Sequence, residues 1–94
     1  MTGNHEYYWD APGWVREVER LGLRALINTH RLVERGAARL LVAGVTDRWA
    51  NGATPGHASD PKVAAAGAPA ADVKLLLAHQ PTSAFAAQSV GFDL

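Results

Sequence analysis

The chain has 94 residues, 48% of them hydrophobic, and its nine basic residues balance nine acidic ones. This length predicts one small domain, and the balanced charge gives no reason to expect nucleic acid or an anionic membrane surface as a partner. The absence of cysteine excludes disulfides, thiolate metal sites and cysteine nucleophiles. No stretch has the ~20 apolar residues of a membrane span, and no basic segment leads into an apolar one as in a signal peptide.

The first secondary-structure element that the sequence predicts is an amphipathic helix. Asp10 precedes Pro12 as in a helix start, apolar residues then recur at helical spacing, and Gly22 ends the pattern. The charged residues on the opposite face are typical of a solvated surface, so we expect no function for them.

Strand-like segments follow. We expect short strands at residues 23–28 and 31–34, a stronger one at 39–45, and a hairpin around Gly36. A further apolar run covers residues 73–78. Continuous apolar character predicts strands covered on both faces, as in layered α/β or α+β sheets.

The remaining segments read as a loop and two short helices. Residues 47–60 are rich in Gly, Ala, Asn, Thr and Pro, which predicts a flexible surface loop that is either a functional lid or disordered. Asp60 and the proline after it predict a helix start, and a second helix is expected from residues 82–83 to 90. Residues 92–94 resemble the start of another strand.

Two motifs carry groups with metal and acid–base chemistry. Residues 3–6 read GNHE, and residues 75–81 read LLLAHQP. An Asn-His pair on a glycine turn offers a carboxamide oxygen as a metal ligand and an imidazole as a proton donor, while a histidine at a strand end offers another ligand. Taken singly, the first motif is also typical of a capped turn, and the histidine of the second is also typical of a hydrogen-bonded core residue.

In this order, the two motifs resemble blocks three and four of the calcineurin-like metallophosphoesterases. That family has five blocks: Asp-x-His, Gly-Asp-x-x-Asp, Gly-Asn-His-Asp/Glu, a lone His, and Gly-His-x-His. The YYW at residues 7–9 and the LAHQP at 77–81 are similar to one bacterial branch. Since the other blocks are absent from residues 1–94, we expect a central fragment, a single partial domain of the phosphoesterase sandwich, with a mixed sheet flanked by short helices.

The resemblance also implies roles for particular residues. Asn4 and His79 would bind the same metal ion, and His5 would donate a proton to the leaving group. Glu6 could orient the His5 imidazole or stabilise its charge. Tyr7 follows these residues directly in the chain, so it could line the substrate pocket. The complete domain would hold two divalent ions (Mn, Fe, Zn or Co) that share a bridging hydroxide as the nucleophile.

Other polar and aromatic residues have weaker signals. Tyr8 and Trp9 could line the pocket but fit helix packing at least as well, and Asp47 fits a turn cap better than a site residue. Trp49 lies in a polar loop, where an exposed tryptophan can be a lid or a contact residue, but nothing else in the sequence supports either role. The histidines at positions 30 and 57 have no partner at metal-ligand spacing, which favours surface or loop roles.

The sequence therefore predicts part of a metal-dependent phosphoester hydrolase, a phosphatase or phosphodiesterase, acting on a phosphorylated small molecule or a lipid-type substrate. Residues 1–94 alone are expected to show little or no activity, because two ligands are too few for a two-metal site. The alternative is a noncatalytic α/β interaction module or a degenerate remnant of the family. Full-length relatives often carry an N-terminal membrane anchor or export signal, so the location is left open, as is the oligomeric state.

Overall fold

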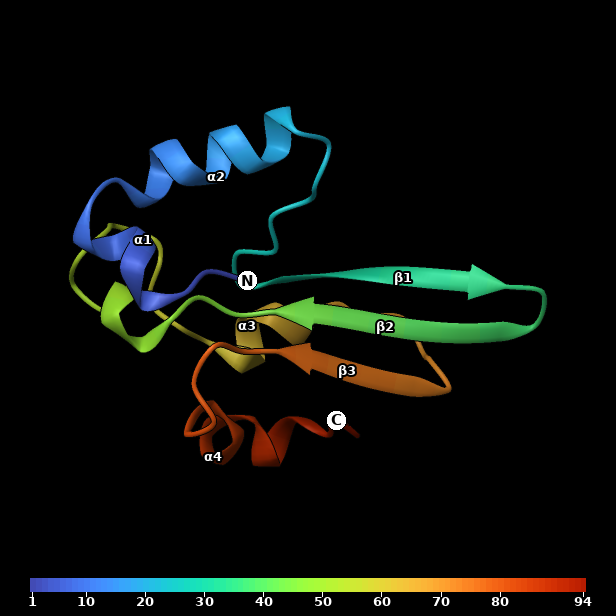
Figure 1. The fold of residues 1–94 in the computed structure, drawn as a ribbon. Helices are drawn as coiled ribbons and strands as arrows, with labels where there is room; N and C mark the ends of the chain where they lie inside the picture. Colours follow the sequence, from blue (N-terminus) through green and yellow to red (C-terminus); the bar gives the residue numbers. More distant parts are fainter.

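A three-stranded mixed sheet with short helices around it forms the centre of the molecule, in a computed structural model that describes residues 1–94 (Figure 1). Strand β1 (Thr29–Arg35) pairs antiparallel with β2 (Ala38–Gly44), and β2 pairs parallel with β3 (Val73–Leu77). The predicted α+β fold class is confirmed, and this arrangement is compatible with part of a phosphoesterase fold.

The β1–β2 hairpin forms where the sequence predicts it. Arg35 pairs with Ala38, so the loop has two residues, and Gly36 adopts a φ of +57°. Two-residue hairpins favour such left-handed conformations, which glycine adopts without steric cost. The hairpin prediction is therefore confirmed, although β1 begins two residues earlier than expected.

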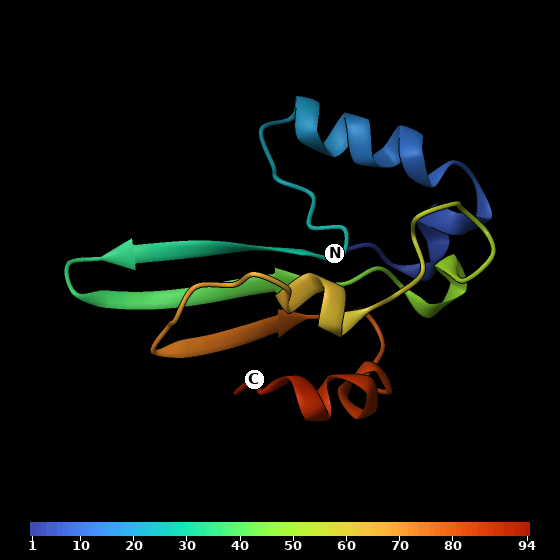
Figure 2. The same cartoon turned by 180° about the vertical axis from the view of Figure 1, so that it is seen from behind.

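The parallel pairing of β2 and β3 needs a crossover, which runs through the short helices η1 (Arg48–Ala50) and α3 (Pro61–Ala65). Asp60 begins α3 as predicted, since its carboxylate accepts hydrogen bonds from two backbone N–H groups of the first turn. Figure 2 shows α3 lying across one face of the sheet. Because β2 and β3 run in the same direction, their carboxyl ends meet at one edge of the sheet (Figure 1).

The core is small and centres on β2. Ala43, Val45 and Ala64 form one buried cluster, and Leu41 is also fully buried. Strand β3 is at most half-buried along its length, so the expectation that both long apolar runs are covered on both faces is wrong for β3. The short helix α3 is too small to cover the whole sheet, and it packs over β1 and β2.

Helix α2 (Ala11–Arg20) confirms the helix predicted from the apolar spacing, and its N-terminus is capped as Asp10 accepts a hydrogen bond from the Gly13 N–H. It stands apart from the sheet in both views (Figures 1 and 2). Trp14 on this helix keeps 53% of its surface exposed. None of the helices combines the length and the apolar character needed to cross a lipid bilayer.

Two segments near the N-terminus differ from prediction. Residues 23–28 form no strand, because no neighbouring strand pairs with them. Leu26 instead packs on β2 at Gly44, where an added Cβ would lie 2.5 Å from the Leu26 Cβ. The second difference is the short helix α1 (Asn4–Tyr8), where the sequence indicated a turn.

The C-terminal segment largely follows prediction. Helices α4 (Ser83–Ala87) and η2 (Gln88–Val90) end at Gly91, whose φ is +81°. The last residues then lie beside β3, since the Leu76 N–H donates to the Leu94 carbonyl and the Asp93 N–H to the Lys74 carbonyl. These bonds resemble the first step of a parallel ladder, although no regular strand forms.

Candidate metal and phosphoester site

The carboxyl ends of β2 and β3 meet α1 at one edge of the sheet, and this is where the predicted site residues gather. Helix α1 and the short helix η1 lie against each other beside these strand ends (Figure 1). His79 follows β3, and the GNHE motif begins α1. Strand ends of this kind are common ligand sites in α/β proteins, because side chains there project beyond the last hydrogen bonds of the sheet.

The two predicted metal ligands are in direct contact. The Nε2 of His79 lies 3.1 Å from the Oδ1 of Asn4, although 75 positions separate them in the chain. A carboxamide oxygen can only accept a hydrogen bond, so the Nε2 of His79 carries the proton and donates. Both atoms therefore point to the same place, and both residues keep contact with solvent.

Gly3 lies close to the side chains of both Glu6 and His79. A Cβ at position 3 would lie 3.4 Å from the His79 ring and 3.2 Å from the carboxylate of Glu6. Its backbone N–H also donates to that carboxylate, at 2.5 Å. A side chain at position 3 would therefore crowd the Glu6 carboxylate, whereas its distance from His79 would be an ordinary van der Waals contact.

His5 projects into solvent beside these ligands. It is exposed, and its ring centroid lies 5.4 Å from that of Tyr8. The Tyr8 hydroxyl in turn accepts a hydrogen bond of 3.1 Å from the Asn4 Nδ2. The amide of Asn4 is held from both ends, by His79 at its oxygen and by Tyr8 at its nitrogen.

Glu6 is placed as a helix cap. Its carboxylate accepts the hydrogen bond from Gly3 described above, and no hydrogen bond joins it to His5. A carboxylate in the first turn stabilises a helix N-terminus, because it satisfies a free N–H and opposes the helix dipole. The orientation of His5 by Glu6 remains a prediction.

The Tyr7 side chain makes its hydrogen bonds with residues other than Asn4 and His79. Its hydroxyl lies 3.0 Å from the Thr2 Oγ1 and 2.9 Å from the Nδ1 of His57, whose ring it meets edge-on. Burial raises the pKa of Tyr7, and the negative charges of Asp47 and Glu6 raise it further, against the hydrogen bond from Thr2. Tyr7 thus fastens the loop of residues 47–60 to α1, while its lining of a substrate pocket remains a prediction.

Asp47 is the most buried charged residue of this edge, with 1% of its surface exposed. Its Oδ1 accepts from the Trp49 N–H at 2.8 Å and from the Nε2 of Gln80 at 3.3 Å, while its own N–H donates to Thr2. The predicted turn cap is confirmed. Asp47 also links the end of β2 to the residue after His79, which the sequence did not indicate.

Residues 47–60 are tied down at several points. Besides η1, the Asn51 side chain accepts from the Ser59 N–H, and Thr46 donates to the backbone carbonyl of His57. His57 therefore has a loop role, as the sequence favoured, but one that reaches α1. The flexibility of this loop remains a prediction.

The donor atoms at this edge suit part of a metal site. A carboxamide oxygen and an imidazole nitrogen are ligands that Mn²⁺, Fe, Zn²⁺ and Co²⁺ all accept. Nowhere in the chain do three or more His, Cys, Asp or Glu side chains converge as a metal centre requires. Asn4 and His79 therefore fit as two members of a larger ligand set, and for ligation the His79 Nε2 would have to lose the proton that it donates to the Asn4 Oδ1, with the ring proton on Nδ1 instead.

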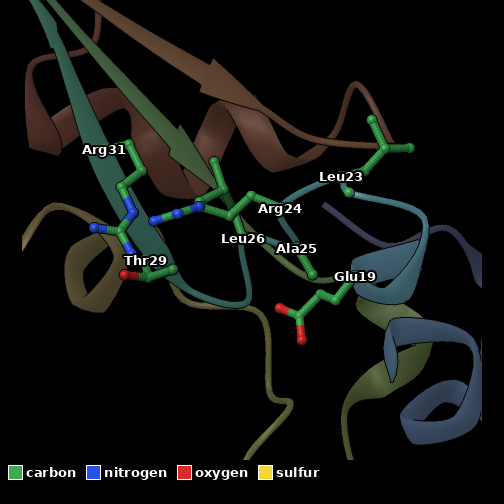
Figure 3. Close-up of a pocket in the computed structure, with 8 residues that line it drawn as sticks. Glu19, Leu23, Arg24, Ala25, Leu26, Thr29 and Arg31 are labelled. Carbon is green, nitrogen blue, oxygen red and sulfur yellow. The ribbon is translucent and has the colours of Figure 1, made fainter. Parts of the chain in front are cut away.

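A separate cavity lies away from the Asn4–His79 pair. It has a volume of about 400 Å³ and is formed by the end of α2, the segment leading to β1, and β1 itself. Figure 3 shows Arg24 and Arg31 reaching over Thr29, with the carboxylate of Glu19 at some distance from them. None of the predicted site residues lines this cavity, so its size alone does not make it the site.

Comparisons with known proteins agree with the motif analysis at the level of the superfamily. The chain is 39% identical over 88 residues to a zebrafish (Danio rerio) protein named as a transmembrane protein with a metallophosphoesterase domain. It is 33% identical over 85 residues to a Caenorhabditis elegans protein named as a metallophosphoesterase. Each alignment covers 88% of this chain, and both support the metallophosphoesterase superfamily.

The chain spans only about a fifth of the length of these curated relatives, 20% of the first and 18% of the second. Both are animal proteins, so the similarity to a bacterial branch is not established by them. No family model matches the chain, and no solved structure matches it.

Proposed function

We propose that this chain forms one part of the active site of a metal-dependent phosphoester hydrolase. The observation that carries the proposal is the contact between the Asn4 Oδ1 and the His79 Nε2, at 3.1 Å. Two motifs 75 residues apart each supply one ligand atom, and the fold brings these atoms together at the edge of the sheet where ligands commonly bind.

The residues have distinct roles in this proposal. Asn4 and His79 hold one of two divalent ions, with the remaining ligands coming from outside residues 1–94. When bound, the ions supply an activated water and neutralise the phosphate oxygens. His5 lies next to Asn4 and is exposed, so its imidazole can reach the leaving-group oxygen and give it a proton.

The proposed substrates are phosphorylated small molecules or lipid-type phosphoesters.

Histidine suits proton donation because its ordinary pKa is near neutrality, so both its protonated and neutral forms are populated under working conditions. We also propose that the chain is related to the bacterial branch that residues 7–9 resemble. The proposed chemistry uses two ions.

The test is metal-dependent hydrolysis by the complete protein that contains this segment. We expect bis(p-nitrophenyl) phosphate to be hydrolysed with Mn²⁺ and not with EDTA, and His5→Ala to lower kcat by about 10²- to 10⁴-fold. Circular dichroism should show that the variant keeps its fold. Near-normal turnover of a folded His5→Ala protein would overturn the role of His5, and no metal-dependent turnover would favour the noncatalytic interaction module.

A further inference from the structure

A shallow groove adjoins the strand end that carries His79. It has a volume of about 290 Å³ and is lined by four residues: Arg48, Trp49, Asn51 and Gln80. Gln80 directly follows His79, and the other three belong to η1 and the residue after it. The groove thus lies beside the proposed metal ligands, and none of its residues has a role in the proposed chemistry.

Trp49 is held in place at this groove while much of it faces solvent. Its side chain is 58% exposed, and its ring meets Tyr8 edge-on, with centroids 5.8 Å apart. Its backbone N–H donates to the buried Asp47. Since Tyr8 also hydrogen-bonds to Asn4, one residue links Trp49 to the proposed metal ligand.

Arg48 gives the groove a positive charge without a carboxylate partner. Its Nη1 donates to the Thr82 hydroxyl at 3.3 Å. Both ion pairs of the chain involve other arginines, at positions 20 and 39. A guanidinium with free donors next to an exposed indole can bind an anionic or carbonyl oxygen on a planar ligand.

From these contacts we propose that the groove is the leaving-group subsite, and that it selects phosphoesters whose leaving group carries a planar aromatic ring, such as aryl or nucleoside phosphoesters. The ring stacks on Trp49, which Tyr8 supports from the side, and Arg48 binds an oxygen of the ligand. Asp47 is a positioning residue that holds Trp49 and Gln80. The identification of the ligand as a phosphoester rests on the function proposed above.

Ring stacking predicts a measurable preference. Stacking of a ring on an aromatic side chain corresponds to roughly a five- to 150-fold gain in affinity. A saturated ring of similar size has no π face and gains less from an indole. Phenyl phosphate and cyclohexyl phosphate therefore form a matched pair of probes, with the same phosphate and nearly the same volume.

The experiment is a titration of the ¹⁵N-labelled chain with each probe, without metal, followed by the NMR signals of the tryptophan indole N–H groups. Trp49→Leu identifies the Trp49 signal by its loss. Trp14→Leu is the matched control, because Trp14 on α2 is similarly exposed, at 53% against 58%. Arg48→Gln tests the guanidinium separately.

We expect phenyl phosphate to shift the Trp49 signal and to bind at least about five-fold more tightly than cyclohexyl phosphate. Trp49→Leu should abolish this preference, and Arg48→Gln should weaken the binding of both probes. Trp14→Leu should change neither the preference nor the affinities. Equal affinity for the two probes, or a preference that survives Trp49→Leu, would overturn the proposal.

A second measurement separates this inference from the proposed function. In the complete protein, Trp49→Leu should lower kcat/KM for an aryl phosphodiester more than for an alkyl one, mainly through KM. Taking the ratio of variant to parent cancels the different reactivities of the two leaving groups. Active protein with an unchanged ratio would overturn the subsite alone, whereas inactive protein with intact ring preference in the titration would overturn the phosphoesterase function alone.

Discussion

Helices α1 and α2 are neighbours in the chain but differ in what holds them. Helix α1 has five residues and is tied to distant parts of the fold by side chains: Asn4 to His79, and Tyr7 to His57. Helix α2 has ten residues, a well-formed cap and a clear apolar stripe, yet it stands apart from the sheet. Helix α1 has fewer helix signals in its sequence than α2, yet it carries the candidate site. Its position is fixed by long-range polar contacts rather than by helix propensity.

The largest effect expected from this difference is on catalysis. In the hydrolase proposed above, Asn4→Ala and His79→Ala should each lower turnover by orders of magnitude, because each removes a proposed metal ligand. Arg16→Gln, on the exposed face of α2, should leave turnover unchanged. The check is kcat at saturating Mn²⁺, and equal activity of all three variants would place the chemistry elsewhere.

A smaller effect is expected on stability. Tyr7→Phe removes the hydroxyl that meets Thr2 and His57, so the free energy of unfolding should fall by about 1–2 kcal/mol. Urea unfolding of the parent chain and the variant measures this difference. An unchanged midpoint would mean that this hydroxyl does not fasten the loop to α1.

The same pair of proteins sharpens the test at high pH. Because the pKa of Tyr7 is raised in the folded chain, the unfolded chain loses this proton first as the pH rises above its ordinary value of 10.0. The stability that Tyr7 contributes is therefore complete below that value and is lost as the pH rises through the folded pKa. The difference in unfolding free energy between parent and Tyr7→Phe should stay constant below pH 10.0 and shrink as the pH rises above it, and a difference that does not change above pH 10.0 would contradict this.

The smallest effect belongs to the outer face of α2. Glu17 and Arg20 form an ion pair there, with both side chains well exposed. Solvent and salt screen such pairs, so Glu17→Gln should leave the Tm unchanged within error. A clear fall in Tm, measured by circular dichroism at low and high salt, would show that α2 is held by more than its contacts in this structure.

The sequence predicted the elements that depend on local signals. Helix α2 follows from its apolar spacing and Asp10, the hairpin from Gly36, and β2 and β3 from their apolar runs. It was wrong for residues 23–28, because a strand forms only with a partner, and it missed α1. No local signal announces such a short helix, whose N-terminus depends on one carboxylate.

The candidate site was only partly predictable. The motifs indicated Asn4 and His79, and the fold places them in contact. The link between Tyr7 and His57 spans 50 residues and depends on the path of the intervening loop, which composition alone does not specify. The same is true of Trp49, whose place beside Tyr8 follows from the buried Asp47 at the end of β2.

The most direct test of the paired ligands is Mn²⁺ titration of the chain followed by paramagnetic broadening of its NMR signals, because this detects weak binding and needs no turnover. The account predicts that the signals of Asn4 and His79 broaden first, and that those of His30, whose Nδ1 is bonded to the Ala64 carbonyl, stay sharp. Asn4→Ala should reduce the broadening at His79. Equal broadening at His30 and His79, or no effect of Asn4→Ala, would contradict a shared metal site at this edge of the sheet.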